Sequence, residues 1–189
     1  MPLTVVRHAP TAANYAGVFQ GQTDVPPLPL GEVTPIPAMP ADVLVSSPLQ
    51  RAVVAARALF PTREPRLDPR LMERAVGAWE GLDRAAVLAS WPDSLVDGRI
   101  NPDVTPPGGE SIGEFLARVH GFLDEQAEET RHVYAVTHNG WIQAALLLTG
   151  VISLGQLFAD PVPFLTPLPL DLRTLYHPDQ VWTPGKPIE

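Results

Sequence analysis

Three short apolar runs, the second and third followed by segments with helical features, restrict the possible folds of this chain more than any other part of its sequence. The runs are Leu3–Val6, Asp42–Val45 and Val133–Thr137. Short runs rich in apolar and β-branched residues suit strands that are covered on both faces, as the strands of parallel sheets are. Strands that alternate with helices predict an α/β fold, here a three-layer sandwich whose mostly parallel central sheet is flanked by helices.

Start and stop signals place the helices between these strands. Ser46-Ser47-Pro48 offers a hydroxyl cap and a proline at the first helical position, which predicts a helix over 49–60. Apolar residues at i, i+3, i+4 and i+7 spacing predict an amphipathic helix over 111–128, with the serine at its start as the cap. Two further helices are expected over 84–91 and 139–148.

The remaining segments have weaker signals. Residues 9–41 are rich in proline, which forbids a helix of useful length, and residues 93–109 are also expected to form a loop. Residues 71–82 are interrupted by glycines and stay ambiguous. Short strands are expected at 66–68 and, in the proline-rich tail, at 170–176.

The composition indicates a globular protein and excludes several functional classes. The 189 residues are 45% hydrophobic and 18% charged, which suits one domain over residues 1–189 with a small cap over about 80–110. Cysteine is absent, so disulfides, zinc–thiolate sites and cysteine nucleophiles are excluded. The net charge is −8 and no basic run exists, so no nucleic-acid partner is expected. The most apolar stretch, Trp141–Leu154, is too short for a membrane span and no signal peptide fits, so we expect a soluble, cytoplasmic protein with no membrane partner.

Two histidines directly follow predicted strands. His8 follows Arg7 at the end of the first strand, and His138 follows the third. Ligands of open α/β sheets bind beyond the carboxyl ends of the strands, where both side chains should therefore lie. Arg51 lies in the first turn of the helix after the second strand, and helix N-termini favour anions. Because arginine donates two hydrogen bonds to one phosphate, these residues predict an anion-binding pocket.

At this point the chain resembles the histidine phosphatase superfamily, which includes cofactor-dependent phosphoglycerate mutase and related phosphatases. The resemblance rests on blocks that occur in the same order over most of the chain: VVRHAPTAAN, FQGQTDVPPLPLGE, SSPLQRA, LMERAVGAWEGL, PPGGES and VTHNGW. It implies a phosphoglycerate mutase-like fold and a single histidine phosphatase domain.

The resemblance also implies roles for individual residues. His8 matches the nucleophile that becomes phosphohistidine, and Arg7 and Arg51 match its phosphate ligands. His138 matches a second pocket histidine that stabilises the transferring phosphoryl group, and Glu73 matches the proton donor to the leaving oxygen. Four more residues match positions that line the phosphate or substrate: Asn14, Gln20, Gly21 and Asn139.

These residue types suit phosphoryl transfer. A neutral imidazole can attack phosphorus and form a covalent intermediate, which splits one difficult step into two. The other ring nitrogen should then donate to a backbone carbonyl and fix the tautomer. Fixed arginine and histidine donors stabilise the charge on the transferring group. Glu73 would act first as general acid and then as general base on water, while Glu80, the nearby rival acid, is expected to have a structural role.

The expected function is a phosphomonoester hydrolase that acts on a small phosphorylated metabolite and needs no metal or other cofactor. The resemblance implies that mutases carry larger basic insertions in the cap, whereas the basic residues here between 80 and 108 are Arg84 and Arg99. The alternatives are a cofactor-dependent phosphoglycerate mutase and a non-catalytic phospho-ligand binder. Such a binder would have no use for a proton donor. A metal site at His8 and His138 lacks supporting spacing.

Two departures from the family pattern affect the expected structure. Ala9 stands where relatives often have glycine, so its φ should be negative or tolerably positive. Only 14 residues, Val33–Ser46, separate Glu32 from Ser47, so a helix that relatives commonly have there is missing. The sheet could then be bare on one flank, which would favour a homodimer or coverage by the proline-rich tail.

Overall fold

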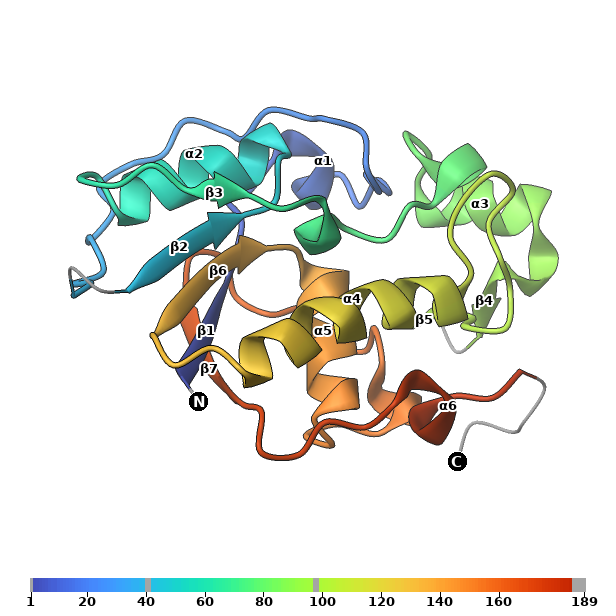
Figure 1. The fold of residues 1–189 in the computed structure, drawn as a ribbon. Helices are drawn as coiled ribbons and strands as arrows, with labels where there is room; N and C mark the ends of the chain where they lie inside the picture. Colours follow the sequence, from blue (N-terminus) through green and yellow to red (C-terminus); the bar gives the residue numbers. More distant parts are fainter. Residues whose placement is uncertain (1, 40–41, 97–98, 185–189) are drawn as a thin grey trace.

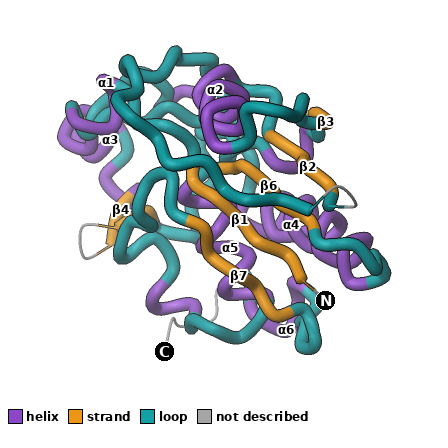
Figure 2. Tube along the Cα trace, turned by 90° about the vertical axis from the view of Figure 1, so that its left-hand side faces the viewer, coloured by secondary structure: helices purple, strands orange, loops and turns teal. Residues whose placement is uncertain are grey.

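A five-stranded sheet forms the centre of the computed structural model, which describes residues 2–39, 42–96 and 99–184. The strand order is β3-β2-β6-β1-β7, and Figure 2 shows the strands side by side. The first four are mutually parallel and β7 is antiparallel to β1, so the predicted mostly parallel sheet is confirmed. The bounds are β1 Pro2–Arg7, β2 Val43–Ser46, β3 Arg66–Leu67, β6 Val133–Thr137 and β7 Pro167–Asp171.

The strand in the tail lies earlier than predicted. We expected it at 170–176, but β7 covers Pro167–Asp171 and includes two prolines. Proline cannot donate to a sheet ladder and is tolerated on an edge strand, and β7 is the edge strand next to β1.

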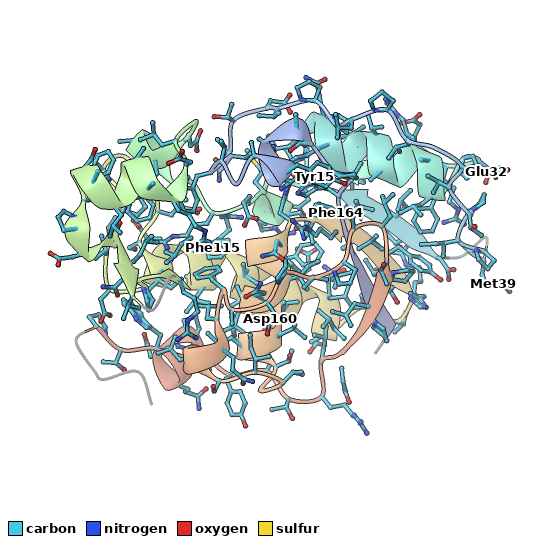
Figure 3. All side chains as sticks on the ribbon, turned by 180° about the vertical axis from the view of Figure 1, so that it is seen from behind. Tyr15, Glu32, Met39, Phe115, Asp160 and Phe164 are labelled. Atoms are coloured by element: carbon cyan, nitrogen blue, oxygen red, sulfur yellow. The ribbon has the colours of Figure 1, made fainter. Side chains whose placement is uncertain are left out.

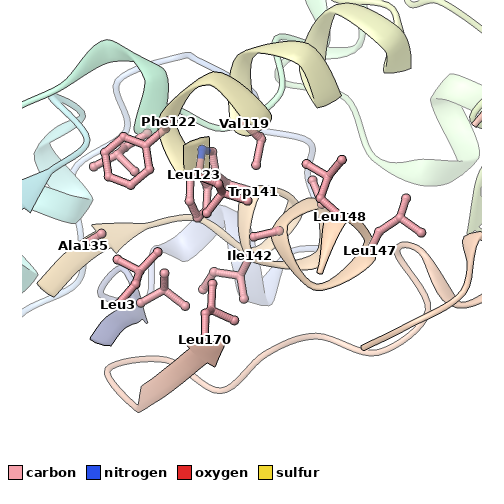
Figure 4. Packing of buried hydrophobic residues seen from close by; sticks show 14 of the residues in the cluster. Leu3, Val119, Phe122, Leu123, Ala135, Trp141, Ile142, Leu147, Leu148 and Leu170 are labelled. Carbon is pink, nitrogen blue, oxygen red and sulfur yellow. The ribbon is translucent and has the colours of Figure 1, made fainter. Parts of the chain in front are cut away.

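Two helices cover one face of the sheet and build the larger part of the core. They are α4 (Ile112–Ala127) and α5 (Asn139–Leu148), and Figure 4 shows their side chains packed against the strands. The predicted stripe of α4 is buried, and Ser111 with Glu114 forms a capping box at its start. A four-residue helix that the sequence did not predict, α6 (Pro178–Val181), packs on both α4 and α5.

The other face is covered by α2 (Gln50–Leu59), which begins later than expected. Its N-cap position is Leu49, with no side-chain cap, so the predicted cap by the serine pair is wrong. Asp24 compensates from a distant segment, because its carboxylate accepts a hydrogen bond of 2.7 Å from the Gln50 N–H. The hydroxyl of Ser47 is used inside the candidate site described below.

An extended, proline-rich segment replaces the missing helix on this flank. Leu30, Val33, Ile36 and Ala38 pack against the α2 layer, and the Ile36 N–H donates to the Leu59 carbonyl at 2.8 Å. Glu32 and Met39, labelled in Figure 3, mark the course of this segment. The expectation of a bare flank is therefore wrong for the described residues, because this segment packs there together with Leu165 of the proline-rich tail. The bare flank therefore no longer supports a homodimer, which stays a prediction.

The cap lies at one end of the molecule, away from α2 (Figure 1). It contains α3 (Arg84–Ser90), which confirms the helix predicted over 84–91. It also contains a small antiparallel pair, β4 (Leu95–Val96) and β5 (Arg99–Ile100), where the sequence predicted only a loop. The loop predicted over 9–41 likewise contains a short helix, α1 (Ala12–Tyr15). Single 3₁₀ turns account for η1 Pro69–Leu71, η2 Gly77–Trp79, η3 Pro92–Ser94 and η4 Leu154–Gln156. Within the described residues, no helix is long and apolar enough to cross a membrane.

Candidate active site

The pairing of β1 with β6 brings the two strand-end histidines together. Arg7 lies opposite Thr137 in the parallel register, and the His8 N–H donates to the Thr137 carbonyl at 2.8 Å. The ring centroids of His8 and His138 are 5.0 Å apart. A pocket of about 230 Å³ opens here. Its lining includes eight of the nine residues that the sequence predicted for the site: Arg7, His8, Asn14, Gln20, Gly21, Arg51, Glu73 and Asn139.

His8 has the tautomer that a nucleophile requires. Its Nδ1 lies 2.6 Å from the Ala9 carbonyl oxygen, which can only accept, so Nδ1 donates and Nε2 carries the lone pair. The imidazole is only 3% exposed. Burial, opposed by the bond to Ala9 and assisted by Arg51 and Arg7, lowers the pKa of His8 to about 3. The ring is therefore neutral at physiological pH. The φ of Ala9 is not positive, so alanine can stand there in place of glycine.

Three hydrogen bonds hold the guanidinium of Arg51 in place. Its Nη2 donates to the Gly21 carbonyl and its Nη1 to the Thr23 carbonyl, each at 2.8 Å. Its Nε donates to His138 at 3.3 Å. Each terminal nitrogen carries a second hydrogen that these bonds leave available for an anion. Burial lowers the pKa of Arg51, opposed mainly by the carboxylate of Glu73.

His138 lies behind Arg51 rather than in the lining of the pocket. It is fully buried, and its Nδ1 accepts the bond from Arg51. Its Nε2 therefore carries the hydrogen and donates to Ser47 Oγ at 2.8 Å. Burial, followed by the positive neighbours, lowers the pKa of His138 well below its usual value. The ring is thus placed to orient Arg51, and its expected role toward the phosphoryl group stays a prediction.

Arg7 is fixed by contacts with the segment that precedes β7. Its Nη1 donates to the Val162 carbonyl at 2.6 Å, and its guanidinium carbon lies 3.7 Å from the centroid of the Phe164 ring. Its buried Nε has no hydrogen-bond partner. Burial lowers the pKa of Arg7 to about 10, opposed by the charge of Glu73, so the side chain remains a cation at neutral pH. A buried cation with a spare donor favours an anionic ligand.

Backbone groups from two segments orient Glu73. Oε1 accepts from the Arg74 N–H and Oε2 from the Gly140 N–H, each at 3.0 Å. Gly140 permits this approach, because a Cβ atom there would lie 2.4 Å from Glu73 Oε1. The carboxyl group is thus held in the pocket that the cationic residues also line.

The four predicted substrate-lining residues also have bonds within the protein. Asn14 Oδ1 accepts from the Thr11 N–H at 3.0 Å, and Gln20 Oε1 accepts from Thr11 Oγ1 at 2.9 Å. Asn139 Oδ1 accepts from the Val162 N–H at 2.8 Å. Gly21 contributes its carbonyl to Arg51, as described above. Since Asn14 and Gln20 bind Thr11 through their oxygens, their amide hydrogens are left for a ligand in the pocket that both residues line.

Glu80, the rival acid, has the structural role that the sequence predicted. Its carboxylate accepts a hydrogen bond of 2.9 Å from the Gln22 N–H and another from the Thr23 hydroxyl. It therefore stabilises the loop whose carbonyls hold Arg51. Gly21 has a φ of 50°, and a Cβ there would lie 2.2 Å from Glu80 Oε1, so this turn requires glycine.

Several pocket residues were not predicted. Arg74 is 2% exposed, and its Nε and Nη2 donate to the Glu110 carbonyl at 3.0 and 2.9 Å. Phe158 and Ile100 also line the pocket, as do Arg84, Phe19, Val18 and Val76. Arg74 follows the predicted acid directly and could have been suspected. Phe158 lies in a tail segment with no motif around it. Within the described part of the chain, no group of three or more His, Cys, Asp or Glu residues could hold a metal ion.

Comparison with known proteins identifies the family. The histidine phosphatase superfamily (branch 1) matches residues 3–160. A protein of Hydrogenobacter thermophilus named as a phosphoserine phosphatase is 32% identical over 160 residues, which cover 79% of each chain. A mycobacterial glucosyl-3-phosphoglycerate phosphatase solved with VO3 has a TM-score of 0.72 and 28% identity, and the match covers 90% of this chain and 92% of that one.

A phosphoglycerate mutase from Thermus thermophilus has a TM-score of 0.68 and 28% identity, with 93% of this chain and 95% of that chain covered. The phosphatase class predicted from the sequence is confirmed by the family match and the phosphatase relatives together. The chain belongs to the histidine phosphatase superfamily, branch 1.

Proposed function

We propose that this protein hydrolyses small phosphate monoesters through a phosphohistidine formed at Nε2 of His8. One observation carries the proposal: a buried, neutral imidazole presents its lone pair in a pocket that Arg7, Arg51 and Glu73 also line. A non-catalytic phosphate binder would need the arginines, but would have no use for a fixed tautomer or for a carboxyl group oriented by two backbone N–H groups.

In the first step, Nε2 of His8 attacks phosphorus and the bond from phosphorus to the ester oxygen breaks. Arg7 and Arg51 bind the phosphoryl oxygens and stabilise their charge in the transition state. The leaving oxygen takes its proton from the carboxyl group of Glu73. General acid catalysis requires the carboxyl group to lie within reach of the leaving oxygen, and Glu73 lines the same pocket as His8.

In the second step, water attacks the phosphohistidine. The Glu73 carboxylate accepts a proton from the water, the bond between nitrogen and phosphorus breaks, and inorganic phosphate leaves. The neutral His8 is restored with its Nδ1 still bound to the Ala9 carbonyl. The ring therefore needs no change of tautomer during the cycle, which supports a covalent route.

The cap favours hydrolysis over mutase action. Of its two basic residues, Arg84 lines the pocket, whereas Arg99 donates to the Gly155 carbonyl and lines a separate small cavity. One cationic side chain from the cap is a weak receptor for a second phosphate group, which a bisphosphate primer would bring.

The test is to trap the covalent intermediate. Wild-type protein mixed with a radiolabelled phosphate monoester and quenched in base should retain label that is stable in base and lost in acid, as expected for phosphohistidine. His8→Asn should neither retain label nor release phosphate from p-nitrophenyl phosphate. His132→Asn, at a histidine bonded to Thr4 outside the pocket, is the matched control and should behave as wild type. Labelling of His8→Asn equal to wild type would refute the proposal, and primer-dependent conversion of 3-phosphoglycerate would indicate a mutase.

A further inference from the structure

The segment that completes the pocket is residues 157–165, here called the strap, which connects η4 to β7. Phe158 has a φ of 62° and Leu165 a φ of 55°, and they are the only non-glycine residues with positive φ among those described. For bulky side chains this conformation is unfavourable and persists only where surrounding contacts impose it. The strap is therefore held in place at both ends.

Side chains from α5 and β1 impose this conformation. Gln143, 3% exposed, accepts from the Phe158 N–H with its Oε1 and donates to the Asp160 carbonyl at 2.8 Å with its Nε2. Arg7 and Asn139 bind the two backbone groups of Val162, as described above. Asp160 and Phe164, labelled in Figure 3, show the course of the strap across the molecule.

The strap uses this fixed conformation to place Phe158 in the wall of the pocket. Phe158 and Ile100 of β5 line both the active-site pocket and the small cavity next to it, so these two side chains separate the cavities. Phe19, Val18 and Val76 supply further apolar lining. The apolar residues come from the cap, the strap, the loop after α1 and the residue before η2, whereas the phosphate-binding residues come from strand ends and α2.

The pocket therefore has two chemically different parts. Arg7, Arg51 and His8 account for the phosphate, so the apolar lining is left for the leaving group. Arg84 is compatible with this division, because its guanidinium carbon lies 5.5 Å from the centroid of the Phe19 ring and adds a flat face to the apolar surface. A polyhydroxylated leaving group would lose hydrogen bonds to water against such a wall, whereas an apolar one gains by burial.

We propose that Phe158 is a specificity-determining residue, positioned by Gln143, and that the preferred substrates are phosphate monoesters whose leaving group carries an apolar body, aryl or branched alkyl, rather than a polyol. The part of this inference that concerns turnover rests on the proposed function. The subsite itself can be tested by binding, because a phosphonate of the same shape occupies it without reacting.

The experiment compares two ligand pairs on wild type and on Phe158→Asn. Asparagine tolerates a positive φ, so this variant removes the ring and keeps the backbone conformation. The first pair is 2-phenylethyl phosphate and glycerol phosphate, both esters of primary alcohols. The second pair is 3-phenylpropylphosphonate and a trihydroxylated phosphonate of similar length. Wild type should favour the phenyl member of each pair by about tenfold or more in kcat/KM and in affinity.

Phe158→Asn should reduce both preferences about tenfold, and Ile100→Ala should reduce them in the same direction. Gln143→Met, which removes both amide bonds while leaving Phe158 intact, should also reduce them, and Gln143→Glu, which keeps the acceptor for the Phe158 N–H, should reduce them less. Leu88→Ala, an exposed residue of α3 outside the pocket, is the matched control.

Preferences equal in wild type and Phe158→Asn, or a wild-type preference for the polyol ligands, would overturn the inference. Absence of turnover of every ester with the phosphonate preference intact would refute the proposed function and uphold the subsite. Turnover of the esters with no preference within either ligand pair would uphold the proposed function and refute the subsite.

Discussion

Acidification should destabilise this protein through His8, because the folded state cannot accept the proton that the unfolded chain takes up. The pKa of His8 is about 3 in the folded protein, and about 6.5 is expected in the unfolded chain. Above pH 6.5 neither state carries the proton. As the pH falls from 6.5 towards 3, only the unfolded chain binds it, so the free energy of unfolding decreases.

The size of the effect follows from these two pKa values. The full difference corresponds to about 5 kcal/mol, reached only near pH 3. Between pH 7.5 and 5.5, in a range where carboxylates stay largely ionised, His8 alone should account for a loss of about 1.4 kcal/mol. The deeply buried His138, whose pKa is also lowered, should add to the measured slope.

Urea denaturation at the two pH values measures this loss, and His8→Asn isolates it. The asparagine amide can donate to the Ala9 carbonyl as Nδ1 does, but it does not titrate. The loss between pH 7.5 and 5.5 should be smaller in this variant than in wild type by about 1.4 kcal/mol. Leu88→Ala should show the full wild-type loss. Equal losses in wild type and His8→Asn would show that the folded protein protonates His8 readily and would refute the argument.

Three further outcomes are expected. Glu73→Gln should lower kcat by about 10² or more for alkyl phosphates but much less for p-nitrophenyl phosphate, whose leaving group needs no proton; equal losses would assign the acid elsewhere. Gly140→Ala places a Cβ 2.4 Å from Glu73 Oε1 and should displace the carboxyl group, lowering kcat about tenfold or more for alkyl esters, whereas wild-type kinetics would show that Glu73 tolerates the shift. Ser47→Ala leaves Nε2 of His138 without its acceptor and should lower the free energy of unfolding by about 1–3 kcal/mol in urea denaturation, and no change would mean that another acceptor replaces the hydroxyl.

The residues of the site could be predicted largely because they follow strands whose apolar runs are visible in the sequence. The positions of Arg7 and His8 follow from the end of β1, and their proximity to β6 follows from the rules of parallel sheets. Glu73 was different, because it lies in a segment with no regular pattern. Only the resemblance to a family indicated it, and its position depends on a backbone N–H of α5.

What could not be predicted depends on contacts between distant segments. Nothing near Ser47 in the sequence indicates that its hydroxyl binds His138 rather than capping α2. Asp24, which binds the start of that helix, is 26 positions away along the chain. Phe158 gave no signal at all, because its place in the pocket results from a clamp by Gln143. The strand in the tail was expected at 170–176, and its actual start at Pro167 depends on an edge position in the sheet, where proline is tolerated.

The extended segment that lies over α2 has a consequence for how the arginine receptor is kept in register. The chain leaves the loop whose carbonyls hold Arg51, is anchored by Asp24 at the start of α2, and then runs along that helix to its last turn, where Ile36 binds Leu59. Because this segment is short and its prolines restrict the backbone, it limits how far the loop that holds Arg51 can move. Lengthening it with glycine would loosen the grip on Arg51 without touching any residue of the pocket.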